Sequence, residues 1–188
     1  ITGSGLPSPG KVSIWNCLDY QKSTFSIVVN EKVLDANIDD KRNELVVVTQ
    51  YHSYLFMNFD KYGKESIDSL SKDDCLVWNH HAKICNYSSL KHLDGKWYII
   101  LFFDAKIDIF KGESSPDSRL RFTHVASQDI GADELGVISC AEWNRNCTEF
   151  VFGSRNGSVW IARYIEDEAT YDRLLQERIA KGVGNVAR

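Results

Sequence analysis

The chain has 188 residues, of which 43% are hydrophobic and 12% aromatic, enough for the core of one domain, and this excludes a wholly disordered chain. Its formal net charge is −4, so a general electrostatic attraction to nucleic acid is not expected; a local basic patch of Lys91, Lys96 and Lys106 remains an alternative. No apolar run approaches the roughly 18 residues that span a bilayer, so no membrane insertion is predicted.

The first part of the chain alternates between β-rich runs and polar turns. Residues 1–5 and 11–16 are predicted to form two strands of a hairpin, residues 24–29 an outer strand, and residues 32–38 an inner strand. A hairpin follows, with strands at 44–49 and 53–57. All of these runs are rich in β-branched and aromatic residues, so the sequence predicts an antiparallel β fold.

The second part of the chain repeats this order. Residues 64–93 are the least regular stretch, and Cys75–Asn79 is predicted to be an inner strand followed by a long connection. A hairpin at 96–103 and 106–110 comes next, then an outer strand at 119–125 and an inner strand at 137–144. The last hairpin joins 149–154 to 159–163.

The spacing of these hairpins predicts a repeat architecture. Equivalent positions in the second strand of each hairpin are Trp15, Met57, Phe110 and Ala162, which are 42, 53 and 52 residues apart. A four-stranded unit that recurs at intervals of about 40 to 50 residues is typical of a propeller blade.

After Tyr164 the apolar period changes to that of a helix. Residues 166–181 place Tyr171, Leu175 and Ile179 on one face, with acidic residues first and basic residues last, and Gly182 would end the helix. This helix either packs against the side of the β domain or links to a further helical region or a partner's groove.

Residues 137–163 carry a resemblance to a known family. An inner strand with Trp143, a strand that ends in Gly153 and Ser154, an Asn156–Gly157 turn and a strand at 159–161 resemble one repeat of a WD-repeat β-propeller. The Asn–Gly pair suits a type I′ turn, in which both central residues have positive φ. No repeat closes with Trp–Asp and no Gly–His precedes an inner strand, so the buried His, Ser and Asp network of the family is not transferred to this chain.

The resemblance implies an all-β, WD40-like propeller over residues 1–164, with about 3.5 to 4 blades, followed by a C-terminal helix and tail over 165–188. Propellers usually have about 4 to 8 blades, and an open sheet edge leaves backbone groups unpaired. The remaining blades are therefore expected on an N-terminal part of the same polypeptide or on a partner chain.

No residue pattern demands an enzyme. His80 and His81 are adjacent, so on a strand they point to opposite faces and cannot chelate one metal. No strand–helix serine elbow or phosphate loop is present, and the paired acids fall in predicted turns or a helix start. The sequence predicts no catalytic residues, no metal and no cofactor.

The five cysteines are odd in number and show no close pairs, which predicts reduced, mostly core-filling thiols. The first residues have neither the basic start nor the apolar stretch of a signal peptide. An intracellular protein, nuclear or cytoplasmic, is expected.

These observations leave surface recognition as the function. We expect a non-catalytic scaffold that binds other proteins in an intracellular complex, among them the subunit or segment that completes the propeller. The binding rim is predicted from exposed turns and consists of Tyr51, His52, Asp104, Arg155 and Asn156. The alternatives are a peptide reader of a histone tail or degron in a chromatin or ubiquitin-linked complex, and a nucleic-acid-associated subunit.

Overall fold

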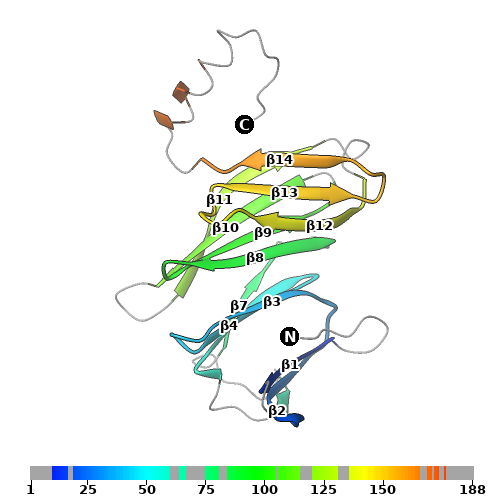
Figure 1. Ribbon diagram of the computed structural model, residues 1–188, viewed down its shortest axis with the longest axis vertical. Helices are drawn as coiled ribbons and strands as arrows, with labels where there is room; N and C mark the ends of the chain where they lie inside the picture. The colour runs from blue at the N-terminus through cyan, green and yellow to red at the C-terminus, as the bar shows by residue number, and fades with distance from the viewer. Residues whose placement is uncertain are drawn as a thin grey trace.

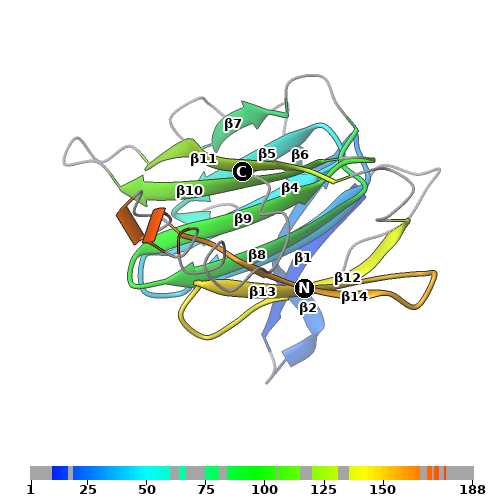
Figure 2. The same cartoon turned by 90° about the horizontal axis from the view of Figure 1, so that it is seen from above.

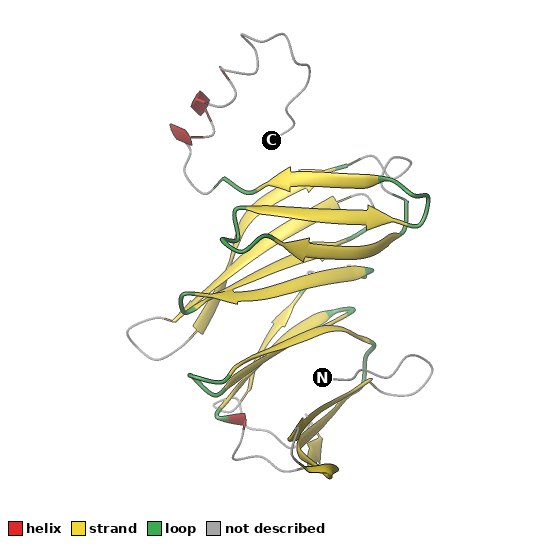
Figure 3. Ribbon diagram, viewed as in Figure 1, coloured by secondary structure: helices red, strands yellow, loops and turns green. Residues whose placement is uncertain are grey.

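A computed structural model of the chain describes residues 10–16, 19–59, 64–66, 75–80, 84–104, 106–114, 120–130 and 136–165, together with Ala169, Thr170, Asp172, Arg173 and Gln176. Every regular element defined among the described residues is a β-strand, and loops and turns connect the strands (Figure 3). The all-β prediction is therefore confirmed. The expected strand at 1–5 and most of the expected helix at 166–181 lie outside the described residues; Ala169, Thr170, Asp172, Arg173 and Gln176 have helical backbone, but no helical element is defined there.

The strands make four sheets that follow one another along the chain (Figure 1). Sheet I contains β1 (Gly10–Asn16), β2 (Asp19–Val29) and β6 (Lys64–Ser66). Sheet II contains, in spatial order, β3 (Val33–Asp39), β4 (Glu44–Thr49), β5 (His52–Met57) and β7 (Cys75–Asn79). Sheet III contains β8 (Tyr87–Leu93), β9 (Lys96–Phe102), β10 (Lys106–Ser114) and β11 (Leu120–Asp129), and Figure 2 shows them side by side in that order. Sheet IV contains β12 (Ile138–Trp143), β13 (Glu149–Ser154) and β14 (Val159–Arg163).

Neighbouring strands are antiparallel, with one exception. β6 pairs in parallel with β2, so the chain returns to sheet I after β5 before it adds β7 to sheet II. Among the described strands, sheets II, III and IV each begin with an edge strand, β3, β8 and β12 respectively, and these three first strands lie beside one another. We call them the inner strands.

One predicted inner strand is in the wrong place. Cys75–Asn79 forms β7, which pairs with β5 on the far edge of sheet II, and the inner strand of sheet III is β8. The sequence of β8 is polar, with Ser88, Ser89, Lys91 and His92, whereas β7 carries Val77 and Trp78. The prediction was wrong because strand propensity favoured the more apolar segment, β7, whereas the polar strand β8 is the inner strand.

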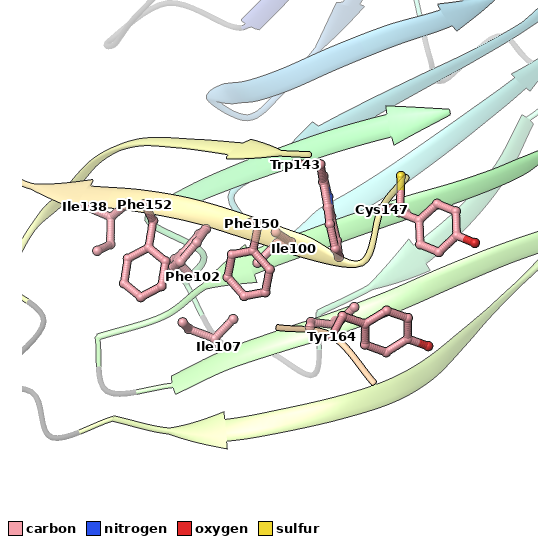
Figure 4. Packing of buried hydrophobic residues seen from close by; sticks show 11 residues of the cluster. Ile100, Phe102, Ile107, Ile138, Trp143, Cys147, Phe150, Phe152 and Tyr164 are labelled. Atoms are coloured by element: carbon pink, nitrogen blue, oxygen red, sulfur yellow. The ribbon is translucent and has the colours of Figure 1, made fainter. Parts of the chain in front are cut away.

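Three apolar clusters hold the sheets together. Val12, Phe25 and Ile27 of sheet I meet Leu45 and Val47 of sheet II. Between sheets II and III, Val46 and Val48 of β4 pack against residues of β9 and β10, among them Trp97, Ile99, Leu101 and Phe110. Between sheets III and IV, Ile100, Phe102 and Ile107 pack against the side chains of Ile138, Trp143, Phe150 and Phe152 (Figure 4). The middle sheets are thus buried on both faces, which explains the continuous apolar run of β9.

Polar bonds between sheets II and III join residues that share one sequence separation. Asn37 donates to the Leu90 carbonyl, Arg42 donates to the Gly95 carbonyl, and the Trp97 indole donates to Glu44; the two residues of each pair are 53 positions apart. Consecutive units therefore lie in the same orientation, with the beginnings of their inner strands at one edge.

The turn chemistry differs from the prediction at one hairpin. Gly157 has a φ of 88°, but Asn156 is not among the residues with positive φ, and the Gly157 amide donates to the Ser154 carbonyl. This is a three-residue loop with glycine in the left-handed position, not a two-residue type I′ turn. Two consecutive positive φ values occur instead at Asp94 (49°) and Gly95 (77°), between β8 and β9.

Candidate functional site

The predicted rim residues occupy three equivalent turns. Tyr51 and His52 lie at the turn between β4 and β5, Asp104 lies between β9 and β10, and Arg155 and Asn156 lie between β13 and β14. In each sheet this turn is next to the start of the inner strand, because the inner strand pairs antiparallel with the second strand. The three turns thus share one edge of the molecule.

Three of the five rim side chains are engaged by other residues of the chain. His52 Nδ1 lies 2.5 Å from a carboxylate oxygen of Glu31. Burial raises the pKa of Glu31, but hydrogen bonds from Thr49 and His52 and the charge of His52 lower it below its ordinary value overall. Asp104 accepts a 2.6 Å hydrogen bond from the Asn86 side chain, and the Asn156 side chain accepts from the Ser158 amide at 2.9 Å.

Tyr51 and Arg155 are the rim side chains available to a partner. Tyr51 is 37% exposed and Arg155 is exposed. Among the described residues, none of the side-chain hydrogen bonds uses the Tyr51 hydroxyl or the Arg155 guanidinium; only the Arg155 amide is engaged, with the Val137 carbonyl at 2.8 Å. Tyr and Arg are residue types enriched at energetically important interface positions.

The inner strands also form a groove of about 540 Å³ that the sequence did not predict. It is lined by β3, β8 and β12, and its polar lining residues are Asp35, Asn37, Ser88, Ser89, Lys91, His92 and Glu142, with Tyr87 alongside. This volume is in the range of small-molecule and peptide side-chain sites.

Two acidic residues are among those that line this groove. Asp35 lies on β3 and Glu142 on β12. Burial raises the pKa of Asp35 to about 6, a shift that the Glu142 charge increases and that hydrogen bonds from the amides of Ala36 and Leu90 reduce. The groove therefore holds negative charge that costs free energy to maintain.

The basic residues in the groove lining are directed to other partners. Lys91 Nζ donates to the carbonyls of Trp143 and Asn144, at 3.2 and 2.9 Å. His92 Nε2 lies 3.3 Å from Asp39. No ion pair between described residues includes Asp35 or Glu142, so the two groove carboxylates have no counter-charge in this part of the chain.

A second polar cluster has the composition of a catalytic triad but not its geometry. Ser127 Oγ donates to Asp108 at 2.5 Å, and His124 Nε2 lies 2.8 Å from Ser127 Oγ and 3.5 Å from Asp108. The Ser127 hydroxyl donates its hydrogen bond to the Asp108 carboxylate, and the same nitrogen of His124, Nε2, lies near both residues. In a catalytic triad the histidine lies between the serine and the aspartate and uses a different nitrogen for each. Burial raises the pKa of Asp108, but hydrogen bonds from Ser127 and Lys106 and the charges of Lys106 and His124 lower it overall, so these neighbours favour the ionised carboxylate.

Four of the five cysteines are among the described residues. Cys75, Cys85, Cys140 and Cys147 are free thiols; Cys140 is exposed and the other three are buried, and Cys17 lies outside the described residues. Burial raises the pKa of Cys85 to about 12, which makes it an inert core thiol. Among the described residues no group of three or more metal-ligating side chains comes together, and His81 is not described.

The three lysines proposed as a basic patch each bind an acceptor of the chain itself. Lys91 binds the end of β12, Lys96 lies 3.3 Å from Glu113, and Lys106 lies 2.9 Å from Asp108. Among the described helical residues, no helix is long and apolar enough to cross a membrane.

Comparison with known proteins adds no further assignment. No protein-family model matches the chain, and no curated protein matches it significantly. The sequence carried one signal for the groove: Asp35 and Glu142 are ionisable residues inside segments that the sequence predicts to be inner strands.

Proposed function

We propose that this chain is part of a β-propeller and acts as a non-catalytic scaffold that binds other proteins in a multiprotein complex. The observation that supports this proposal best is the outer face of sheet IV. Val151, Val159 and Ile161 lie on it, and Val159 and Ile161 are 71% and 79% exposed. Adjacent apolar side chains on a regular sheet mark an interaction surface.

The occupant that we propose for this face is a further antiparallel sheet with an apolar face. The corresponding face of sheet III, with Tyr98, Ile100 and Ile109, is buried by sheet IV, and that of sheet II, with Val46 and Val48, is buried by sheet III. Sheet IV would continue this mode of packing. The further sheet would come from additional residues of the same polypeptide or from a partner chain.

The rim is the second proposed contact surface. Tyr51 and Arg155 project from equivalent turns of sheets II and IV, and their neighbours in the turns are held by hydrogen bonds. Such pre-organised turns lose little conformational entropy on binding. We expect Tyr51→Ala and Arg155→Ala to weaken assembly with the partner, and unchanged partner binding in both variants would refute this role of the rim.

The first test compares the mass of the native particle, by light scattering, with the masses of its denatured chains. We expect the native particle to contain more polypeptide than one 21.4 kDa chain. If the further sheet belongs to a partner chain, the double variant Val159→Asp, Ile161→Asp should lose that chain; if it belongs to the same polypeptide, the denatured chain should itself exceed 21.4 kDa. The matched control is Val77→Asp on β7, because Val77 is 57% exposed but lies on a different sheet, and this variant should keep the particle intact.

Three outcomes would contradict the proposed occupant. A single-chain particle of 21.4 kDa in which the Val159 and Ile161 side chains are exposed to solvent would refute a completed propeller. A particle of the same mass in which these two side chains are protected from solvent would show that the chain covers its own face. A particle of two identical chains that the double variant separates would identify a second copy as the occupant.

A further inference from the structure

Strand β14 forms one edge of sheet IV. Sheets II and III each have a fourth strand, β7 and β11 respectively, that pairs antiparallel with the third strand of the sheet. Among the described residues, sheet IV has only three strands, and none of them pairs with β14 on the side away from β13. The position that β7 and β11 occupy in their sheets is thus open in sheet IV within the described part of the chain.

The register of the β13–β14 pair determines which backbone groups point to this open edge. The Ser154 amide donates to the Ser158 carbonyl at 3.0 Å, and the Tyr164 amide donates to the Thr148 carbonyl at 2.8 Å. The pairs between these two bonds are in regular antiparallel register, in which hydrogen-bonded and non-hydrogen-bonded pairs alternate. Every second residue of β14 therefore bonds to β13, and the residues between them direct their N–H and C=O groups away from it. These outward-directed residues are Val159, Ile161 and Arg163.

Strand β14 also lacks the features that keep an exposed sheet edge from pairing, which are charges within the strand, proline and bulges. It reads Val-Trp-Ile-Ala-Arg, and its pairing with β13 has no register shift. Its one charged residue, Arg163, is the last of the strand and lies 2.7 Å from Glu149. By contrast, β11 carries Arg121 and His124 within the strand and pairs with β10 across a register shift. A regular and largely apolar edge such as β14 is suited to strand addition.

Sheets II and III indicate which side chain an added strand would place beside β14. Leu55 of β5 lies opposite Leu76 of β7, and Ile109 of β10 lies opposite Ala126 of β11. Ile161 is the equivalent residue of β14, 52 positions after Ile109. Leu55 and Ile109 are 1% and 7% exposed, whereas Ile161 is 79% exposed. We therefore expect an apolar residue of the added strand to lie opposite Ile161.

The described chain does not supply this strand. The described residues between 169 and 176 have helical backbone, so at that point the chain does not return along β14 as a strand. The first described strand, β1, belongs to sheet I, which lies at the opposite end of the row of sheets from β14 (Figure 1). Both observations favour a second polypeptide as the source.

We propose that β14 binds an extended, antiparallel segment of a partner protein through the backbone groups of Val159, Ile161 and Arg163, with an apolar side chain of that segment opposite Ile161. Strand addition gains affinity from main-chain hydrogen bonds and specificity from alternate side chains. The inference rests on the proposed scaffold role, because it names the segment by which a partner is held. It is separate from the contact proposed for the outer face of sheet IV, which uses side chains and not the backbone edge.

The first test compares residue-resolved hydrogen exchange in the native particle and in the isolated 188-residue chain. In the isolated chain the amides of Ile161 and Arg163 should exchange rapidly. Those of Trp160 and Ala162 should exchange slowly, because they bond to β13. In the native particle the amides of Ile161 and Arg163 should exchange at least a hundredfold more slowly than in the isolated chain, and those of Trp160 and Ala162 should slow by a smaller factor.

Two results of this exchange measurement would overturn the inference. Rapid exchange of the Ile161 and Arg163 amides in the native particle would show that no strand is added. Slow exchange of the same amides in the isolated chain would show that the chain itself covers this edge. A native particle that contains no second polypeptide, or that contains a second copy of this chain in its place, would also contradict the proposed occupant.

A matched pair of variants at one residue separates the backbone from the side chain. Both Ile161→Pro and Ile161→Ala remove most of the side chain, but only Ile161→Pro removes the outward N–H group, and proline is tolerated on an edge strand where that group makes no bond within the sheet. We expect the partner chain isolated from the native particle to bind Ile161→Pro at least tenfold more weakly than Ile161→Ala. Val159→Pro compared with Val159→Ala repeats the test if Ile161→Pro does not fold.

The same variants distinguish this inference from the contact on the outer face. Equal binding of the partner chain to the proline and alanine variants would overturn strand addition. If the partner were still lost from Val159→Asp, Ile161→Asp, the face contact would stand without it. Weaker binding to the proline variant, with the partner retained by the aspartate double variant, would support strand addition and refute the face contact.

Discussion

Sheets III and IV have strands of similar composition but different surroundings. In sheet III both faces of β9 are covered, and Trp97, Ile99 and Ile100 are fully buried. In sheet IV, Phe150 and Phe152 of β13 are buried against sheet III, whereas Val151 between them is exposed. The difference is that sheet IV covers one apolar face of sheet III, whereas the outer face of sheet IV carries apolar side chains that no described residue covers; our proposal places a further sheet there.

The largest expected change in stability comes from truncating a buried isoleucine of sheet III. Ile100 on β9 is fully buried, so Ile100→Ala should lower the free energy of unfolding by about 3 to 4 kcal/mol in urea denaturation, from lost burial and the cavity left behind. A loss below about 1 kcal/mol would show that the interface of sheets III and IV is loosely packed.

The groove between the inner strands offers the next effect. Asp35 has a pKa of about 6 in the folded chain against the ordinary 3.8, so the unfolded chain loses its proton first as the pH rises. The free energy of unfolding should therefore fall between about pH 4 and about pH 6 and stay lower above. Asp35→Asn should be more stable than the unmodified protein at pH 7 by about 2 kcal/mol, and the difference should vanish below about pH 4.

Asp129→Asn, an exposed replacement, should leave the pH profile of unfolding unchanged. If Asp35→Asn were instead less stable at pH 7, the carboxylate would have a cationic partner in the native protein, and the groove would already be neutralised.

Two turn glycines allow the boundary between sheets II and III to be compared with the exposed β13–β14 turn of sheet IV. Gly95 and Gly157 both have positive φ, 77° and 88°, so alanine is strained at each. A Cβ atom at Gly95 would lie 2.5 Å from Arg42 Nη2, whereas nothing lies within 4 Å of one at Gly157. We expect Gly95→Ala to cost about 1.5 kcal/mol and Gly157→Ala about 1 kcal/mol in thermal unfolding. Equal costs would mean that Arg42 moves away freely.

The smallest expected change in stability comes from truncating an exposed isoleucine of sheet IV, the counterpart of Ile100→Ala on sheet III. Ile161 on β14 is 79% exposed, so Ile161→Ala should change the free energy of unfolding of the isolated chain by less than about 0.5 kcal/mol. In the native particle the same substitution should cost about 2 kcal/mol or more, because the proposed further sheet would bury this side chain. An equally small effect in both preparations would argue against that sheet.

Much of the fold was predictable because the signals are local. The hairpins at β4–β5, β9–β10 and β13–β14 follow from alternating or continuous apolar runs between polar turns. The exchange of β7 and β8 was not predictable, since an edge position depends on which strands pair and not on the residues of the strand alone. The prediction of a type I′ turn at Asn156–Gly157 was wrong for a related reason. The conformation depends on the length of the loop between the paired strands, and not on the dipeptide alone.

The spacing of the hairpins predicted where the rim residues lie, but it did not predict which rim side chains are available to a partner. Tyr51 and Arg155 remain accessible, while His52 and Asp104 are held by Glu31 and Asn86 of other segments and Asn156 is held within its own turn. The groove escaped prediction because the residues that line it belong to inner strands far apart in the sequence, which lie side by side only in the tertiary structure.

The sequence by itself determined the all-β class, the recurrence of hairpins and the turns that link them, since backbone propensity and the two-residue alternation act within a few residues. Only the tertiary structure decided which strands are inner, which apolar faces are covered and which residues line the groove. Those features depend on pairing between units about 53 residues apart, and no local pattern reports the burial or charge that a distant strand will impose.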